Sequence, residues 1–493
     1  MVDGHALHGF IERFGDARIL CAGDVMLDRF VYGDVERISA EAPIQVLHVR
    51  SESAMLGGVG NVARNVVALG GRAVLVAAVG DDDAGGQITD LARAEGQLDG
   101  RLIIEPGRQS TVKTRYLASG QQLLRADEET TRPLGEDTAR RLVSAIESAL
   151  AEVDILVLSD YAKGVLGGGV IRAAIDAARA AGVPVIADPK RVDFETYAAV
   201  SVLKPNKAEL ASATNLPCES DEEIEAAARK AISDCGIDAI LVSRSQRGMT
   251  LVERDAPALH LPGRALEVFD VSGAGDTVVA TTAVSLAAGA DLAAAAQLAN
   301  IAAVVVVGKV GTAVVHRDEL SSAVLAAEVS TSEAKVVSPE AAAERAARWR
   351  AQGLKVGFTN GCFDLLHPGH VSLLTESRAA CDRLIIGLNS DDSVRRLKGD
   401  DRPVQSETAR ALVLASLSMV DLVVVFGDDT PIPLLELLRP DVLIKGGDYS
   451  LDEVVGADVV RAYGGEIKLA ALVPGHSSSN VIAKMSNRSG KKA

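Results

Sequence analysis

The chain has few cysteines and none of the sequence features of an exported or membrane protein. Five cysteines occur in 493 residues, and no two form a C-x-x-C pair. Such sparse spacing indicates reduced thiols and a cytoplasmic location. No apolar run reaches the roughly 18 residues of a membrane span. The first residues lack the basic and apolar regions of a signal peptide. We therefore expect a cytoplasmic protein without a membrane partner.

Positive charge is also scarce. The 51 Lys and Arg residues against 67 Asp and Glu give a net charge of −16. This balance argues against nucleic acid as a partner, because a phosphate backbone is bound by clustered cations. Small phosphorylated ligands need only local positive groups and stay compatible with it. The Walker motif G-x-x-x-x-G-K-[ST] is absent as well, which excludes a P-loop nucleotide site.

The chain is rich in apolar residues, which supply 48% of it. This content suffices for large cores, and the length predicts two or three domains. Strands alternating with Ala- and Val-rich helical runs indicate an α/β fold with parallel sheets covered by helices. Shorter strands at 29–50 and 111–125 stand apart from this alternation. We expect them to pair as antiparallel strands in a small sheet that covers the site.

Polar residues follow several predicted strands. Asp24 follows a strand at 17–22, Asn206 follows one at 200–203, and Ser243 ends one at 239–243. The carboxyl ends of parallel strands open onto one crevice, where α/β sheets bind ligands. Asp24 could therefore accept hydrogen bonds from sugar hydroxyls, or it could simply cap a turn.

A pair of glycines, Gly57 and Gly58, opens a segment that fits the dinucleotide-binding pattern G-x-G-x-x-A. That pattern requires a buried strand directly before it, and the polar residues 50–53 indicate a break instead. We therefore reject a nicotinamide or flavin site. The glycines predict a turn that lets a substrate approach the backbone, with Asn61 offering a donor and an acceptor to its hydroxyls.

Asn206 and Glu209 lie three residues apart where a helix is predicted to begin, so they share one face. They could hold a hydrated Mg²⁺ near phosphates, or they could form a capping box that only starts the helix. In a later apolar helix, Asn300 could face an adenine or bond to its neighbours.

The segment 269–289 joins a glycine-rich loop to an apolar helix. Gly273 and Gly275 let backbone N–H groups approach an anion, and the helix start adds a partial positive charge. Asp276 places a carboxylate in the same position. A base beside a phosphoryl group would accept the proton of an attacking sugar hydroxyl. An ordinary helix cap is the alternative.

These motifs, in this order, resemble the ribokinase-type (phosphofructokinase-B-like) carbohydrate kinases over residues 18–320. The resemblance implies an α/β/α sandwich with a small β lid, often used for dimerisation, and it implies ATP and Mg²⁺. It implies that Asp276 is the catalytic base and that Asn206 and Glu209 hold the metal through water. The implied sugar-binding residues are Asp24, Gly57, Gly58 and Asn61. The ATP-site residues are Asn206, Lys207, Ala208, Glu209, Ser243, Gly273, Ala274, Gly275 and Asn300.

The first domain is predicted to span 1–328, followed by a connector and entry helix at 329–352. The second, 353–493, opens with a strand and the motif N-G-C-F-D-L-L-H-P-G-H. His367 and His370 lie three apart at a helix start, where two imidazoles suit polyphosphate oxygens. A metal pair would lack a third ligand at suitable spacing. Cys362 as a nucleophile would lack a base.

The H-x-G-H motif after a strand resembles the nucleotidyltransferase superfamily, which implies a Rossmann-like domain. In that chemistry a phosphate oxygen attacks the α-phosphorus of a nucleoside triphosphate and expels pyrophosphate. The nucleophile is already anionic, so positioning and charge neutralisation carry the rate. We assign phosphate contacts to His367, His370 and Lys398. The other predicted nucleotide-site residues are Asp364, Lys445, Gly446, Asp448 and Ser478.

Together the two halves resemble the bifunctional enzymes of bacterial ADP-heptose synthesis. The resemblance implies ATP-dependent phosphorylation of heptose 7-phosphate at C1, and adenylyl transfer from ATP to heptose 1-phosphate. It also implies a homodimer formed through the lid of the kinase half. Two alternatives stay open: a different sugar or nucleotide, such as CTP, or one half that senses nucleotides without catalysis.

Overall fold

The computed structural model describes residues 4–118, 120–263, 272–309, 311–446 and 454–470. The chain forms two compact units, Met1–Leu325 and Ala326–Ala493. Helix α10 (Arg317–Glu333) runs through this division, so residues 329–333, expected to belong to a connector, are helical. Leu320, Val324 and Ala327 are buried at helical spacing, so they lie on one face of this helix.

Within the described residues, the main sheet of the first unit has nine strands in the order β13-β12-β11-β10-β9-β8-β1-β4-β5. The strands from β11 to β5 are parallel, while β12 and β13 form an antiparallel edge. The bounds are β1 (Arg18–Gly23), β4 (Arg72–Gly80), β5 (Leu98–Glu105), β8 (Ile155–Ser159), β9 (Val185–Asp188), β10 (Val202–Leu203), β11 (Ala239–Ser243), β12 (Met249–Glu253) and β13 (Leu259–Leu261). The chain builds one side of the sheet from β1 and then returns to add β8, so the topology switches between β1 and β8. Open sheets bind ligands at that point.

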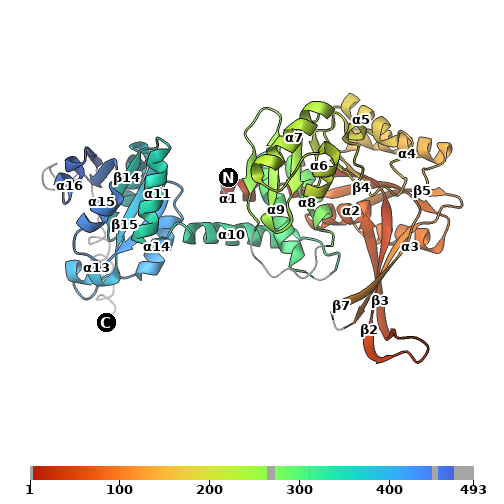
Figure 1. Ribbon diagram of the computed structural model, residues 1–493, viewed down its shortest axis with the longest axis horizontal. Helices are drawn as coiled ribbons and strands as arrows, with labels where there is room; N and C mark the ends of the chain where they lie inside the picture. The colour runs from red at the N-terminus through yellow and green to blue at the C-terminus, as the bar shows by residue number, and fades with distance from the viewer. Residues whose placement is uncertain (1–3, 119, 264–271, 310, 447–453, 471–493) are drawn as a thin grey trace, which may run out of the picture. The chain divides into compact units, whose positions relative to one another are not determined.

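Helices cover both faces of this sheet (Figure 1), which confirms the predicted α/β/α layers. On one face α2 (Val59–Ala68), α8 (Ala274–Ala287) and α9 (Leu292–Val307) pack together. On the other, an apolar core joins the strands to α4 (Glu136–Ala149), α5 (Val170–Ala180), α6 (Lys207–Thr214) and α7 (Asp221–Cys235). Two further helices are α1 (Gly4–Glu12) and α3 (Asp83–Ala94).

A second sheet in this unit forms the lid, in the order β3-β2-β6-β7. Its strands are β2 (Val25–Ile38), β3 (Gln45–Gly58), β6 (Thr111–Ala118) and β7 (Gln121–Glu128), and they extend away from the body of the unit (Figure 1). The hairpins β2–β3 and β6–β7 are antiparallel as expected, but β2 and β6 pair in parallel. The intervening α2–β4–α3–β5 segment returns the chain to the same edge, so both hairpins leave the body in the same direction.

Strand β3 corrects one premise of the sequence analysis. The polar residues 50–53 belong to this strand, which continues to Gly58, so a strand does precede the glycines. Its side chains there are polar because they are exposed on the lid. β3 pairs antiparallel with β2, whereas the dinucleotide pattern needs a buried parallel strand, so the rejection of a dinucleotide site still holds.

The second unit contains a parallel sheet in the order β16-β15-β14-β17-β18. Its strands are β14 (Val356–Gly361), β15 (Arg383–Asn389), β16 (Leu422–Phe426), β17 (Val442–Gly446) and β18 (Glu466–Ala470). Its helices are α11 (Pro339–Ala351), α12 (Pro368–Ala379), α13 (Asp391–Lys398), α14 (Glu407–Ala415), α15 (Ile432–Leu438) and α16 (Ala457–Ala462). The chain starts at the central strand β14 and builds each side in turn, so its switch point lies beside the end of β14. In the described ranges no helix is both long and apolar enough to cross a membrane.

Candidate active sites in the two units

The glycine-rich loop of the first unit ends where α8 begins. Gly273 caps this helix with φ +80°, and no side chain bonds to the first turn from the cap position. A Cβ at Gly273 would lie 2.9 Å from Asn61 Nδ2 and 3.0 Å from Thr312 Cγ2, so only glycine fits between α2 and α8. The first-turn N–H groups have no partner within the helix. They form an anion-binding position immediately before Asp276.

Asp276 is buried in the first turn of α8, at 3% exposure. Asn61 Nδ2 donates to its Oδ2 at 2.8 Å, and the Tyr161 hydroxyl donates to its Oδ1 at 2.7 Å. Burial raises the pKa of Asp276 to about 7, with these two hydrogen bonds acting in the opposite direction. A carboxylate with a pKa near neutrality can accept and release a proton under physiological conditions.

Two residues expected at the sugar make other contacts. The Asn61 amide nitrogen bonds to Asp276. The Asp24 carboxylate, 1% exposed, accepts the backbone N–H groups of Tyr161, Lys163 and Val165 at 2.8–3.1 Å. Asp24 therefore holds the loop that follows β8. Direct sugar contacts from Asp24 and Asn61 stay predictions.

Gly57 lies against a buried ion pair that the sequence analysis did not identify, whereas Gly58 lies against the Asp24 carbonyl and Met26. A Cβ at Gly57 would approach Asp28 Oδ2 to 2.3 Å, and Asp28 Oδ1 lies 2.6 Å from Arg115 Nη1. This pair joins β2 to β6 at the base of the lid. Its only sequence signal was an Asp and an Arg at inward positions of the lid strands.

A second buried pair lies beside the glycine loop. Lys204 Nζ is 3.0 Å from Asp188 Oδ1, and a Cβ at Gly275 would lie 3.1 Å from the same nitrogen. The ammonium group therefore lies against the anion-binding position. Lys204 directly follows β10 and Asp188 is the last residue of β9, and strand-end position was the signal that could have identified them. Tyr161 follows β8 and carries the same strand-end signal, and it too was absent from the predicted site residues.

Asn206 and Glu209 form the capping box that the sequence left as the alternative. Asn206 Oδ1 accepts a hydrogen bond from the Glu209 N–H, and Glu209 Oε2 accepts one from the Asn206 N–H, both at 2.9 Å. In addition, Lys190 Nζ lies 3.1 Å from Glu209 Oε1. Among the described residues no three acidic, His or Cys side chains gather as a metal site. Two side chains cannot enclose the ion by themselves, so the pair fits Mg²⁺ only through water. The Asn206 Oδ1 and Glu209 Oε2 atoms each keep one further lone pair that can accept a hydrogen bond from such a water.

The remaining predicted ATP residues of this unit surround the start of α6 or lie farther along the sheet edge. Lys207 and Ala208 are the first residues of α6, and the backbone at Ser243 bridges to Asn206. Asn300, on α9, donates its amide to the Pro262 carbonyl at 3.0 Å. Whether these residues bind ATP stays a prediction.

In the second unit the two histidines of H-x-G-H stack on each other. Their ring centroids are 3.8 Å apart, His367 caps α12, and His370 also lies against Phe363. Burial, followed by the nearby His367 and Lys398, lowers the pKa of His370 to about 4. Lys398 is exposed at the end of α13. Because its charge acts on His370, we group Lys398 with the two histidines in one electrostatic cluster.

Lys445 and Asp364 lie at the same end of this sheet. The Lys445 ammonium donates to Asn360 Oδ1 at 2.5 Å, and burial lowers its pKa to about 8. Asp364, 1% exposed, pairs with Arg402 and accepts the N–H groups of Val404 and Gln405. Burial opposes its ionisation, but these contacts lower its pKa. Gly446 ends β17, whereas Asp448 and Ser478 lie outside the described residues.

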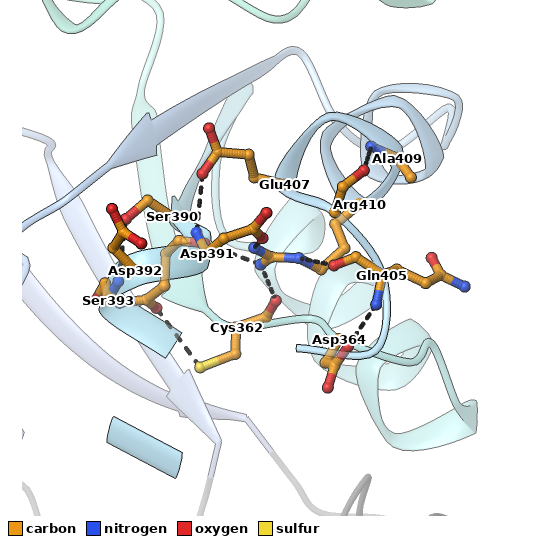
Figure 2. A network of polar contacts seen from close by, with 12 residues as sticks. Cys362, Asp364, Ser390, Asp391, Asp392, Ser393, Gln405, Glu407, Ala409 and Arg410 are labelled. Carbon is orange, nitrogen blue, oxygen red and sulfur yellow. Dashed lines mark hydrogen bonds and ion pairs between the residues drawn. The ribbon is translucent and has the colours of Figure 1, made fainter. Parts of the chain in front are cut away.

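Arg410 is a further residue that the sequence analysis missed (Figure 2). Its side chain is fully buried and donates to the carbonyls of Cys362, Asn389 and Gln405, at 2.6, 2.9 and 3.1 Å. It also pairs with Asp391 at 2.6 Å. One guanidinium thus joins the ends of β14 and β15 to the first turn of α13.

Comparisons with known proteins agree with this division into two sites. Residues 16–318 match the pfkB family of carbohydrate kinases, and residues 358–484 match the cytidylyltransferase-like family. Phosphofructokinase-2 from Escherichia coli, solved with substrates and products, is 20% identical with a TM-score of 0.53, covering 63% of this chain and 98% of its own. That likeness shows the fold of the first unit.

Full-length relatives carry both halves. "Bifunctional protein HldE" of Paramagnetospirillum magneticum is 56% identical over 98% of this chain and 99% of its own length. The protein of the same name from Rhodospirillum rubrum is 57% identical over 98% of each. The chain belongs to this family of bifunctional HldE proteins, in which a pfkB-type carbohydrate kinase is joined to a nucleotidyltransferase.

Proposed function

We propose that the first unit transfers the γ-phosphoryl group of ATP to the C1 hydroxyl of heptose 7-phosphate. The proton of that hydroxyl passes to Asp276, its oxygen attacks the γ-phosphorus, the bond to the bridging oxygen breaks, and ADP leaves. The position of Asp276 carries this proposal: a buried carboxylate with a pKa of about 7 lies in the first turn of a helix whose N-cap is a glycine. The N–H groups of this turn, at Ala274 and Gly275, would stabilise the charge on the transferring phosphoryl.

The charge on the phosphates is countered in two ways. Lys204 supplies a fixed ammonium group beside the loop. Asn206 and Glu209 would hold Mg²⁺ through its water shell, and the ion would neutralise the β- and γ-phosphates when bound. The capping box keeps these two side chains in place at the start of α6.

In the second unit, we propose adenylyl transfer from ATP to heptose 1-phosphate. The sugar phosphate oxygen attacks the α-phosphorus and pyrophosphate leaves, so no general base is required. His367, His370, Lys398 and Lys445 would contact the triphosphate, and they lie at the end of β14 and around it. The match to a cytidylyltransferase-like family makes CTP the alternative nucleotide.

The test measures two products separately in one protein. Asp276→Asn should lower ADP release from ATP and heptose 7-phosphate by about 10²–10⁴-fold, because it removes the proton acceptor. Pyrophosphate release from ATP and heptose 1-phosphate should be unchanged. His370→Asn should lower pyrophosphate release and leave ADP release unchanged. Faster pyrophosphate release with CTP than with ATP would favour the alternative, and a folded Asp276→Asn protein that lost both activities would contradict the two-site proposal.

The lid is the proposed dimer surface. Ile38, Ile44 and Leu124 are 68%, 61% and 59% exposed on its strands and turn, and a second copy of the lid would cover such a group. Light scattering should give twice the chain mass for the wild type and one chain mass for Ile38→Glu. Val192→Glu is the matched control, since Val192 is 60% exposed outside the lid. A wild type at one chain mass would refute the dimer.

We also place the protein in the cytoplasm, where both reactions would have ATP. All five cysteines are unpaired, as expected in a reducing compartment.

A further inference from the structure

The loop after β8 brings a tyrosine hydroxyl onto the proposed base of the kinase. We propose that Tyr161 is a positioning residue of this site: its hydroxyl keeps the Asp276 carboxylate ionised and aimed at the sugar hydroxyl. The inference rests on the proposed role of Asp276 and adds a second residue on which that role depends.

The geometry holds the carboxylate from both sides. The Tyr161 hydroxyl lies 2.7 Å from Oδ1, and Asn61 Nδ2 lies 2.8 Å from Oδ2. Arg64 Nη1 donates to Asn61 Oδ1 at 3.4 Å, which turns the amide nitrogen toward Asp276. The two donors come from different elements, the β8 loop and α2, so neither oxygen can rotate without losing a hydrogen bond.

The loop that carries Tyr161 is itself held rigidly. The Asp24 carboxylate accepts three of its backbone N–H groups, and Arg108 Nη2 donates to the Lys163 carbonyl at 2.6 Å. Ala162 has φ +55°, in the left-handed region, and its N–H donates to Asp160 Oδ1. A non-glycine residue in that conformation persists only where its surroundings hold it, as at many functional sites.

The charged groups around Asp276 indicate that the Tyr161 hydroxyl acts as a hydrogen-bond donor to its carboxylate. Besides Asn61 and Tyr161, the groups that face Asp276 are Asp188 at the end of β9 and Lys204 after β10, which pair with each other at 3.0 Å. Burial raises the pKa of Tyr161 well above its usual range, so the phenol keeps its proton and donates. Burial also raises the pKa of Asp276 to about 7, and the Tyr161 hydrogen bond opposes that rise.

The sign of the effect follows from this arrangement. Removing the hydroxyl removes a donor to the charged form, so the pKa of Asp276 rises further. A protonated carboxyl cannot accept the sugar proton, so the loss of activity is largest at low pH and recovers at high pH. A residue that only packed the loop would lower activity equally at every pH.

The test is the pH profile of ADP release for Tyr161→Phe from about pH 6 to 9. The midpoint of the rising limb of kcat/KM should lie near 7 in the wild type and about one pH unit higher in Tyr161→Phe. The matched control is Tyr197→Phe, which loses a buried hydroxyl bond to another carboxylate, 2.6 Å to Asp160 Oδ2, and should keep the midpoint of the wild type.

An unmoved midpoint, with activity reduced equally across the range, would overturn the inference. If Tyr161→Phe does not fold, 3-fluorotyrosine placed at position 161 decides the matter, because its stronger donor should move the midpoint down; no movement would again overturn it. A wild type that releases no ADP with heptose 7-phosphate would overturn the proposed function itself, and this inference with it.

Discussion

In the second unit, burial lowers the pKa values of two proposed phosphate-binding residues, His370 and Lys445, before any ligand binds. Burial lowers the pKa of His370 to about 4 and that of Lys445 to about 8. Both groups therefore hold fewer protons than exposed ones would, although their proposed task is to meet a polyanion. A triphosphate placed beside them favours the protonated forms and raises both pKa values.

This arrangement predicts proton uptake when ATP binds. Because the pKa of Lys445 is lowered to about 8, the free protein should hold only part of this proton at pH 8, and a bound triphosphate should draw the missing fraction from the buffer. Calorimetry in buffers of different ionisation enthalpy should show that share of the uptake lost in Lys445→Met. Lys398→Met, at an exposed cation of the same cluster, should keep it. Equal uptake by the wild type and Lys445→Met would contradict the contact.

Among the elements, the start of α13 depends on one side chain. Arg410, on α14, joins two strand ends to Asp391 through four hydrogen-bonding partners (Figure 2). Because α13 ends in Lys398, the orientation of this helix places a proposed phosphate contact. A planar guanidinium can bond in several directions at once, whereas an ammonium group cannot reproduce that fork.

Arg410→Lys should therefore lower adenylyl transfer by about 10²-fold, as a small displacement of a positioned group can do. The kinase activity should not change, since Arg410 lies in the other unit. The control is Arg383→Lys, whose partly exposed pair with Asp421 contributes little. Pyrophosphate release at saturating ATP, with circular dichroism to verify folding, measures the effect. Full activity in a folded Arg410→Lys protein would show that α13 does not need this clamp.

For the whole molecule, the chain has two compact units with separate sheets and cores. The second unit includes residues from the connector. Val336 forms a parallel β-bridge with Val423 on β16, and the Val337 N–H donates to the Val423 carbonyl. A break between Glu333 and Lys335 would therefore spare the strand pairing of both units.

We accordingly expect fragments 1–333 and 334–493, expressed separately, each to keep one activity. ADP release should remain with the first fragment and pyrophosphate release with the second, and a mixture should reproduce both rates of the intact chain. If either folded fragment were inactive until the other was added, the two sites would depend on each other and the proposal of independent sites would be wrong.

Much of the fold could be predicted from local sequence. The strand at 239–243 has the predicted bounds, because a short apolar run flanked by polar residues defines a buried parallel strand. The lid hairpins were also predicted, but not the parallel pairing of β2 with β6, since that depends on where the intervening segment returns the chain. Residues 329–333 were assigned to the connector although α10 runs to Glu333, because Ser and Thr near its end weaken the local helical signal.

The sequence by itself determined the chemistry available at each site, because short motifs such as G-A-G-D and H-P-G-H carry their own backbone geometry and functional groups. Only the tertiary structure decided which partners these groups have. Tyr161 meets Asp276 across 115 residues, and Arg410 meets Cys362 across 48. Such contacts join segments that are brought together by sheet order and helix packing, so no local pattern records them. Burial, which raises the pKa of Asp276 and lowers those of His370 and Lys445, is likewise a property of the packed molecule.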